Sequence, residues 1–362
     1  MVVTEPAVEK PHSADELAAI LKTAGHDEQA VVPVGGGRAR TMGNPVERCD
    51  VLLHTTRLDR VIEHSQADMV VTVEAGITLE ELQAELGKAG QFLPLDPFNS
   101  PGHTVGGLLA SGWTGPLRLR YGSPRDFLIG IRVALPDGKL VSAGGRVVKN
   151  VSGYDMMKLH YAALGTLGVI VAASFKVFPR PLADVTVTGP SALCWDLVDQ
   201  AMALPLQPAA IEILLTGDVV ARFFGSRDAV ARSVAQLGWS ESDPETWTRH
   251  SEESIGKWAR FALPRQDLRR VLESLPEGAG RWWASPAAGI AHWAADGTAA
   301  ELQAIRRRVE SLGGSLVMMA APDDFMREVG AWGRPPETLE IMRRLKHAFD
   351  PAGILNPGRF VY

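Results

Sequence analysis

Three consecutive glycines follow a short apolar segment near the N-terminus. They are Gly35, Gly36 and Gly37, and Arg38 follows them directly. Glycine permits backbone conformations in which successive N–H groups point toward one place, and such a cluster of donors binds phosphate. The adjacent arginine adds positive charge. The segment therefore predicts a site for a phosphate or a pyrophosphate, with a plain tight turn as the alternative that needs the same glycines.

The spacing of these glycines differs from the two best-known nucleotide-binding motifs. If Gly35 and Gly37 are taken as the first two glycines of a Rossmann fingerprint, Arg40 stands at the third position. A Walker loop would continue into Gly-Lys-Ser/Thr, which does not follow here. A dinucleotide bound at this segment therefore needs a site of another kind.

Two further glycine-rich blocks lie in the same half of the chain, at residues 96–112 and 144–170. In the first of them, Gly106 and Gly107 begin a short helix of small residues, where backbone N–H groups are available to an anion. Close packing of that helix is the alternative explanation for the pair. Three such blocks in one half favour a long, phosphate-bearing ligand that runs through it.

Catalytic groups are harder to assign than the glycine blocks. The chain has nine histidines, and none stands in a His-Glu-x-x-His or His-x-His pattern, so we expect no metal site. His250 lies in a polar segment, and His292 in an apolar strand is typical of a satisfied core histidine. Arg125 and Asp126 suit a surface ion pair. No catalytic residue is assigned from the sequence.

Composition narrows the class of protein. The 362 residues are 46% hydrophobic and 22% charged, which is typical of a globular protein of about two or three domains. The net charge of −5 argues against nucleic-acid binding and polybasic membrane binding. Two distant cysteines, Cys49 and Cys194, exclude a disulfide framework and a four-thiolate iron–sulfur site. Without a signal-like N-terminus or an apolar stretch of ~20 residues, we expect a cytoplasmic protein with no transmembrane segment.

The glycine blocks must be positioned by alternating helices and strands in the first half. Ser13 with Glu16 and Thr78 with Glu81 have the spacing of capping boxes. They predict helices over residues 13–23 and 78–88, the first closed by Gly25. Apolar runs predict strands over 29–34, 51–54, 69–74 and 169–178, and a hairpin over 129–135 and 140–142.

The second half shows a repeated order of elements. Residues 185–237 and 259–311 each have the pattern β-α-β-β-α with a closing strand, which is the order of a ferredoxin-like unit. Two such units can share one antiparallel sheet with helices on one face. We expect a first domain over 1–182, a cap domain over 183–330, and a tail over 331–362 that has a basic helix at 336–348.

Together these segments resemble the flavin-binding domain of the vanillyl-alcohol-oxidase/PCMH superfamily, and more narrowly the FAD-binding subunits of bacterial glycolate oxidase. The resemblance covers residues 28–181 and 348–359, and residues 145–155 favour the glycolate oxidase subunits over larger relatives. It implies an α+β fold, in which a PCMH-type FAD-binding domain of two subdomains carries a ferredoxin-like antiparallel-sheet cap.

The resemblance also implies which residues contact FAD. These are Val34, Gly35, Gly36, Gly37, Arg38 and Ala39 at the pyrophosphate; Thr104, Val105, Gly106, Gly107, Ser111 and Gly112 along the flavin; Val169 and Ile170 from their strand; and Asn356 and Arg359 from the tail.

The sequence departs from the family pattern at three places. Arg38 stands where covalent flavoproteins of the superfamily carry a histidine, which implies that FAD is bound non-covalently. His103 replaces a small residue beside the flavin segment, and residues 162–164 replace the usual Gly-Ser-x.

The implied function is that of an FAD-dependent oxidoreductase, a subunit of a complex that oxidises glycolate or a similar 2-hydroxy acid to the 2-oxo acid. Its implied partners are a larger FAD-linked subunit and an iron–sulfur subunit, with attachment to a membrane through the complex left open. Larger relatives hold the carboxylate with arginine and histidine groups of the cap. No such cluster is visible in residues 183–330, so the isolated chain is expected to bind FAD but to oxidise glycolate poorly. The alternatives are a stand-alone oxidoreductase for another alcohol or hydroxy acid, and a scaffold that has lost the flavin.

Overall fold

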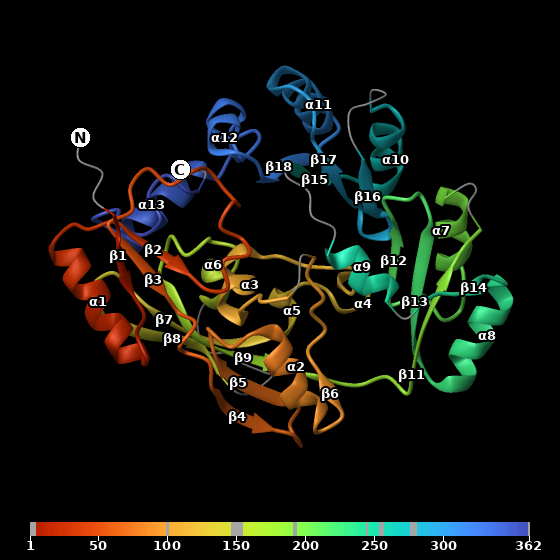
Figure 1. The fold of residues 1–362 in the computed structure, drawn as a ribbon, viewed down its shortest axis with the longest axis horizontal. Coiled ribbons are helices and arrows are strands. Elements are labelled where there is room, and N and C mark those ends of the chain that lie inside the picture. Colours follow the sequence, from red (N-terminus) through yellow and green to blue (C-terminus); the bar gives the residue numbers. More distant parts are fainter. Residues whose placement is uncertain are drawn as a thin grey trace.

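The computed structural model describes residues 5–98, 101–145, 155–190, 194–243, 245–252, 257–275 and 281–360. The third glycine-rich block falls partly at residues 146–154, outside this set. Three sheets, one of them only two-stranded, form the N-terminal half of the described chain, and one large sheet forms the C-terminal half beside it (Figure 1). In the part of the chain that the structure describes, no helix combines the length and the apolar character needed to cross a bilayer.

A small parallel sheet begins the N-terminal half. Its strands lie in the order β1 (Ala7–Glu9), β3 (Val51–His54) and β2 (Val31–Val34). Helix α1 (Ala14–His26) packs Leu17 and Leu21 against this sheet. The sequence predicted that the helix ends at residue 23 and is closed by Gly25, and this was wrong, because α1 continues through Gly25 to His26. A Cβ at Gly25 would lie 2.8 Å from the carbonyl oxygen of Pro136, so glycine here allows a close approach.

A larger antiparallel sheet carries the glycine blocks. Its strands, in order, are β4 (Val61–Ser65), β5 (Val70–Glu74), β9 (Val169–Lys176), β7 (Leu128–Ala134) and β8 (Leu140–Gly144). Helices α2 (Leu79–Gly87) and α3 (Val105–Ser111) pack on it with the apolar side chains Leu82, Leu86, Leu108 and Leu109. The capping box of Thr78 and Glu81 is present as predicted.

Short elements connect this sheet to its surroundings. They are β6 (Gln91–Phe92), β10 (Phe178–Pro179), α4 (Arg118–Tyr121), α5 (Pro124–Phe127) and α6 (Met157–His160). The expected surface pair of Arg125 and Asp126 is wrong. Asp126 instead accepts hydrogen bonds from the backbone N–H and the hydroxyl of Ser123, and so caps α5.

The C-terminal half is built on one antiparallel sheet, here called the cap sheet. Its strands, in order, are β14 (Ser240–Glu241), β11 (Ala183–Thr188), β13 (Val219–Gly225), β12 (Ala210–Ile213), β16 (Trp282–Ser285), β17 (Ile290–Ala294), β15 (Trp258–Ala262) and β18 (Ser315–Ala320). Read from either edge, the strands follow the order fourth, first, third, second of one unit, which is the ferredoxin-like order. The predicted pair of ferredoxin-like units in one sheet is therefore confirmed.

The two faces of the cap sheet differ because side chains alternate along each strand. Helices α7 (Cys194–Met202), α8 (Arg227–Leu237), α10 (Arg265–Glu273) and α11 (Ala299–Ser311) cover an apolar face that includes Phe223, Phe261 and Trp293. The opposite face carries Trp258 and Trp283, which join the core of the N-terminal half. This second face and α9 (Thr246–Glu252) lie against the N-terminal half (Figure 1).

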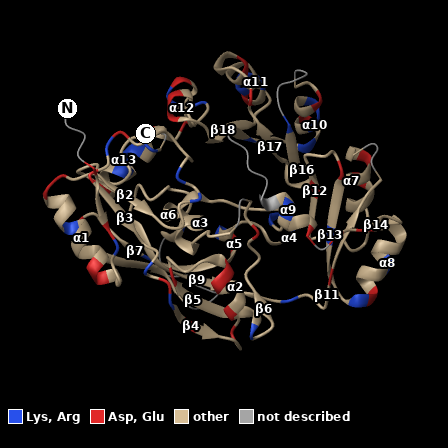
Figure 2. Cartoon of the chain, in the orientation of Figure 1, with Lys and Arg blue, Asp and Glu red and all other residues tan. Residues whose placement is uncertain are grey.

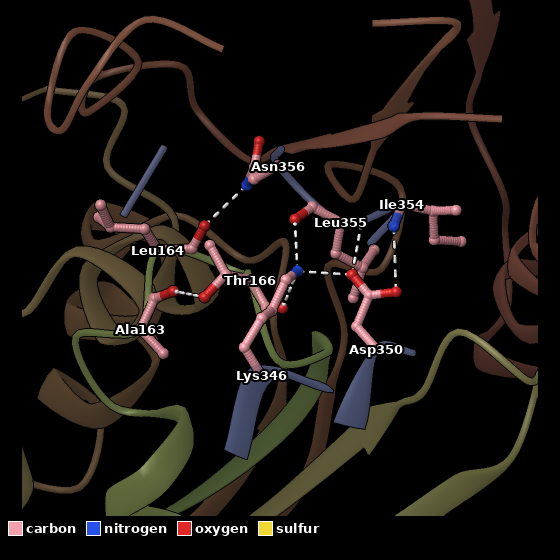
Figure 3. Close-up of polar contacts among 8 residues, drawn as sticks. All are labelled: Ala163, Leu164, Thr166, Lys346, Asp350, Ile354, Leu355 and Asn356. Carbon is pink, nitrogen blue, oxygen red and sulfur yellow. Dashed lines mark hydrogen bonds and ion pairs between the residues drawn. The ribbon is translucent and has the colours of Figure 1, made fainter. Parts of the chain in front are cut away.

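The tail leads back to the first sheet. Helices α12 (Asp323–Val329) and α13 (Leu339–Phe349) precede it, and Leu355 forms a parallel bridge with Val31 of β2. Acidic and basic positions are interspersed over most helices, and α13 carries the basic residues that the sequence indicated (Figure 2). The Lys346 ammonium forms an ion pair of 2.5 Å with Asp350 and donates to the carbonyl oxygens of Thr166 and Leu355 (Figure 3). The hydrogen bond to Thr166 ties the tail to the N-terminal half.

Candidate functional site

A cleft, here called the glycine cleft, lies where the loop after β2, the start of α3 and the tail meet. Most of the predicted cofactor residues line it: Val34, Gly35, Gly36, Gly37, Arg38, Ala39, Thr104, Gly107, Ser111, Asn356 and Arg359. The fold thus brings together segments from residues 34–39, 104–111 and 356–359, which are far apart in the sequence.

Thr104 connects the first two of these segments. Its hydroxyl oxygen accepts hydrogen bonds from the backbone N–H groups of Gly36 and Gly107, at 3.3 and 3.2 Å. The loop lies so close that a Cβ at Gly35 would be 2.1 Å from this oxygen. A Cβ at Gly36 would be 1.7 Å from the carbonyl oxygen of Gly102. Glycine is therefore required at both positions for the cleft to form.

The tail supplies the opposite side of the cleft. Asn356 donates a hydrogen bond from Nδ2 to the carbonyl oxygen of Leu164, at 2.7 Å (Figure 3). Its Oδ1 is buried and has no hydrogen-bond partner within the described ranges. Arg359 donates from Nη1 to the carbonyl oxygen of Met42 at 3.1 Å, which holds its guanidinium at the cleft.

The chemistry of the cleft suits one kind of ligand. Backbone N–H groups of a glycine loop and the guanidinium groups of Arg38, Arg40 and Arg359 suit a phosphate or pyrophosphate. The unpartnered Oδ1 of Asn356 suits an N–H donor on the same ligand. A dinucleotide whose base or ring system carries an N–H group meets both requirements.

The remaining predicted cofactor residues do not line the glycine cleft. Val105, Val169 and Ile170 are buried in apolar cores. Gly106 packs α3 against β5's end, since a Cβ there would lie 2.8 Å from that of Ala75, and Gly112 ends α3 with a φ of 66°. Their contact with a cofactor stays a prediction.

A second cavity, here called the arginine pocket, lies between the cap sheet and the N-terminal half. Arg118, Arg260, Trp113, Ser285 and His292 are among its lining residues. It adjoins the glycine cleft, because Ser111 lines the cleft and Trp113, two residues later, lines the pocket. The Trp113 ring also lies 5.1 Å from that of His103, a cleft residue, between ring centroids.

The charges of the arginine pocket are uncompensated. Among the described residues, neither Arg118 nor Arg260 forms an ion pair with a carboxylate. Burial, with the neighbouring charge of Arg118, lowers the pKa of Arg260, while Tyr161 opposes this shift. Two guanidinium groups that share a half-buried pocket suit a carboxylate, which one of them can bind in bidentate fashion.

His292 stands beside Arg260 on the adjacent strand of the cap sheet. Its ring stacks on Trp283 with centroids 4.7 Å apart, and its Nδ1 has no hydrogen-bond partner in the described structure. The expectation of a satisfied core histidine was therefore wrong. Burial, together with the charges of Arg260 and His250, lowers the pKa of His292 well below its usual value. The ring is held neutral, with a free nitrogen in the buried layer.

Unsatisfied polar atoms concentrate in this layer. Buried atoms without a partner in the described ranges include Trp113 Nε1, Trp283 Nε1, His292 Nδ1, Glu212 Oε2 and His250 Nε2. Such atoms are rare in folded proteins, and a cluster of them indicates a place built to meet another molecule or to move protons. The sequence reasoning missed this layer. The available signal was the presence of Glu212, Arg260 and His292 at the strand positions that no helix covers.

The comparisons with known proteins agree with the glycine cleft. A family model described as "FAD binding domain" matches residues 6–144, and one described as "FAD linked oxidases, C-terminal domain" matches residues 326–360. The second match contains Asn356 and Arg359, which the fold brings to the cleft.

Similar curated proteins include the glycolate oxidase subunit GlcE of Escherichia coli (strain K12). It is 30% identical over 92% of this chain and 93% of its own length. The D-lactate dehydrogenase of Archaeoglobus fulgidus is 26% identical over 98% of this chain and 91% of its own length. The glycolate oxidase subunit GlcD of Bacillus subtilis is 30% identical, over 58% of this chain and 45% of its own length. A solved alkyldihydroxyacetonephosphate synthase has the same fold, with a TM-score of 0.72 and 17% identity over 98% of this chain and 77% of that chain.

Proposed function

The chain belongs to the PCMH-type FAD-linked oxidase family that includes the glycolate oxidase subunit of E. coli, and is thus an FAD-dependent oxidoreductase. On this basis, we propose that it oxidises glycolate or a similar 2-hydroxy acid to the 2-oxo acid. We propose further that it does so as one subunit of a glycolate oxidase complex. The observation that carries this proposal is the arginine pocket, which adjoins the glycine cleft and contains two guanidinium groups without an acidic partner among the described residues.

The glycine cleft holds the cofactor in this proposal. FAD, when bound, accepts a hydride from the substrate. The N–H groups of Gly35 and Gly37 and the Arg38 guanidinium bind its pyrophosphate, and Asn356 Oδ1 accepts a hydrogen bond from an N–H group of the flavin ring. The cleft provides no group for a covalent bond at Arg38, so FAD is held by non-covalent contacts alone.

The arginine pocket, whose volume of about 10 Å³ has room for one water molecule, widens to hold the acid in this proposal. Arg118 and Arg260 bind the carboxylate, Ser285 Oγ accepts a hydrogen bond from the 2-hydroxyl group, and the neutral ring of His292 lines the pocket beside them. Trp113, on the border of the cleft, excludes water and orients the reacting C–H bond. The combined effect is to fix a small hydroxy acid by its charged end.

This arrangement removes the reason for expecting poor activity from the isolated chain. That expectation depended on the lack of a visible clamp for the carboxylate in the cap, and the clamp proposed here consists of Arg260 of the cap and Arg118 of the first half, which line one pocket. We therefore assign the oxidation to this chain itself. With two cysteines, the chain has no iron–sulfur site of its own, and electrons leave through a larger FAD-linked subunit and an iron–sulfur subunit.

A panel of substrates with an artificial electron acceptor tests the proposal. Glycolate and lactate should be oxidised by the FAD-loaded chain, whereas ethylene glycol, which replaces the carboxylate of glycolate by an alcohol, should not. Equal rates with glycolate and ethylene glycol would favour the stand-alone alcohol oxidoreductase. A purified chain that retains no FAD would favour the scaffold.

A further inference from the structure

A row of polar side chains leads away from the arginine pocket across the cap sheet. It begins at Ser285, which lines the pocket and donates a hydrogen bond from Oγ to Oε1 of Glu212. Glu212 is fully buried on the neighbouring strand β12. Its other oxygen, Oε2, lies 3.8 Å from Nε2 of His250 in α9. Three polar groups thus follow one another through the interior.

The row ends in another cavity, here called the outer pocket. It lies between α2 and α9, has a volume of about 300 Å³, and is lined by His250 and by Glu80, an exposed residue of α2. Phe98 and Pro116 line both the arginine pocket and the outer pocket, and so form an apolar wall between them. The polar connection between the two pockets consists of Ser285, Glu212 and His250.

Two neighbouring atoms of this row lack a hydrogen bond in the described structure. Glu212 Oε2 and His250 Nε2 both lack a hydrogen-bond partner in the part of the chain that the structure describes. A buried polar atom without a partner is destabilising, so a purely structural pair would be expected to close this gap. A shared proton would satisfy Oε2 and Nε2 once they approach to hydrogen-bond distance, about 3 Å. Carboxyl and imidazole groups are also the side chains that most often transfer protons near neutral pH.

Two ionisable groups beside the row, His292 on the inner side and Asp96 on the outer side, affect where the substrate proton can go. His292 is a poor acceptor of a full proton, because burial and the charge of Arg260 lower its pKa well below the usual value. On the outer side, Asp96 and Arg222 line the same cavity as His250. Burial raises the pKa of Asp96 to about 8, although hydrogen bonds from Leu117 and the charge of Arg222 oppose this shift.

We propose that Ser285, Glu212 and His250 form a path that carries the hydroxyl proton of the substrate from the arginine pocket to the outer pocket. The path depends on the function proposed above. As the C–H bond breaks, its hydrogen leaves with both bonding electrons as a hydride, which FAD, when bound, would accept. The O–H bond breaks as Ser285 Oγ takes that proton and passes its own to Glu212 Oε1. Glu212 delivers a proton from Oε2 to His250 Nε2, and His250 releases one to solvent, so one proton leaves for each that enters.

Substitution of Glu212 by glutamine tests the path directly. Glu212→Gln keeps the shape and the acceptor for Ser285 but cannot transfer a proton. Under anaerobic conditions with glycolate and a pH-indicator dye, bleaching of the flavin and release of the proton should both slow by about 100-fold. The glycolate concentration at half-maximal rate should not change, because the carboxylate clamp is intact. Glu241→Gln, at the exposed edge strand β14 of the same sheet, should behave as the wild type.

Chemical rescue separates proton transfer from a structural role. His250→Ala should also slow the reaction, and added imidazole should restore the rate at least about tenfold, since the outer pocket has room for it. Loss of rate without rescue would mean that His250 only holds α9 in place, and would overturn the path. A readout without substrate is the ¹⁵N NMR signal of the His250 ring, which should move in Glu212→Gln and not in Glu241→Gln.

The outcomes distinguish failure of the path from failure of the proposed function. If the wild type bleaches with glycolate and Glu212→Gln bleaches equally fast, the path is wrong and the proposed function stands. If the wild type does not bleach with glycolate or lactate, the proposed function fails and the path fails with it. If Glu212→Gln does not fold, His250→Ala and its rescue by imidazole decide the question.

Discussion

Asn356 Nδ2 donates a hydrogen bond of 2.7 Å to the carbonyl oxygen of Leu164, and both residues line the glycine cleft. Leu164 has a φ of 51° and Asn356 a φ of 45°, so each holds a left-handed conformation, which asparagine adopts more readily than most residues and leucine rarely adopts. The ion pair of Lys346 and Asp350 fixes the tail next to this contact (Figure 3). The tail is therefore part of the cofactor site rather than an appendage.

Asn356→Leu should weaken FAD binding. The change removes the donor to Leu164 and the unpartnered Oδ1 that we assign to the cofactor. A loss of about 1–3 kcal/mol corresponds to roughly a 5- to 150-fold rise in the dissociation constant. Titration of the apoprotein with FAD, followed by flavin fluorescence, measures it. An unchanged dissociation constant, with the fold intact, would show that the tail does not contact FAD.

Gly36→Val should abolish retention of FAD. A Cβ at Gly36 would lie 1.7 Å from the carbonyl oxygen of Gly102, so the loop cannot keep its position against Thr104. Gly145→Ala is a matched control, because a Cβ there meets nothing within 4 Å. The flavin-to-protein ratio after purification measures the effect, and full occupancy in Gly36→Val would contradict the assignment of the loop.

FAD should be released when the protein is denatured. Arg38 cannot form the histidyl bond to the flavin, and acid precipitation should leave a colourless pellet and a yellow supernatant. His103 lines the cleft, but its Nε2 lies 3.1 Å from the carbonyl oxygen of Phe98. Colour that stays in the pellet would show a covalent bond, and its loss in His103→Ala would identify His103 as the attachment site.

His160 should make stability depend on pH. Its ring is buried against Phe349, and burial lowers its pKa from 6.5 to about 4. His160 therefore binds a proton more tightly in the unfolded chain than in the folded one. Its contribution to the free energy of unfolding is fully present above pH 6.5 and is lost as pH falls toward 4. The difference amounts to about 3 kcal/mol. Urea unfolding of the wild type and of His160→Leu between these pH values measures it. Parallel pH profiles for the two proteins would contradict the account.

Much of the fold was predictable because its signals are local. The Ser13–Glu16 and Thr78–Glu81 patterns mark helix starts within four residues of sequence, and both helices begin there, although only Thr78 and Glu81 form the full capping box because Glu16 accepts from His12 instead. The order of elements in the second half predicted the ferredoxin-like units, because that order restricts the possible topologies to a few. Gly25 misled the prediction, since its reason is a contact with Pro136, a residue far along the chain.

The candidate site, like the fold, has one part that the sequence predicted and one part that it did not. The glycine loop could be predicted because its glycines are consecutive and follow a strand. The arginine pocket could not, because Arg118 and Arg260 meet only when the cap sheet lies against the first half. Likewise, Glu212 stands alone in an apolar strand, and its neighbours Ser285 and His250 come from other elements. No local sequence pattern indicates a contact between residues that lie so far apart in the chain.

The central claim is that this chain binds the carboxylate of a 2-hydroxy acid through Arg260 beside its own FAD. Anaerobic mixing of the FAD-loaded chain with glycolate, without any partner subunit, tests it most directly. The flavin of the FAD-loaded wild type should lose its colour within one turnover. Arg260→Met, which keeps FAD but loses the guanidinium, should bleach about 100-fold more slowly at the same glycolate concentration. A wild-type flavin that keeps its colour, or an Arg260→Met flavin that bleaches equally fast, would contradict it.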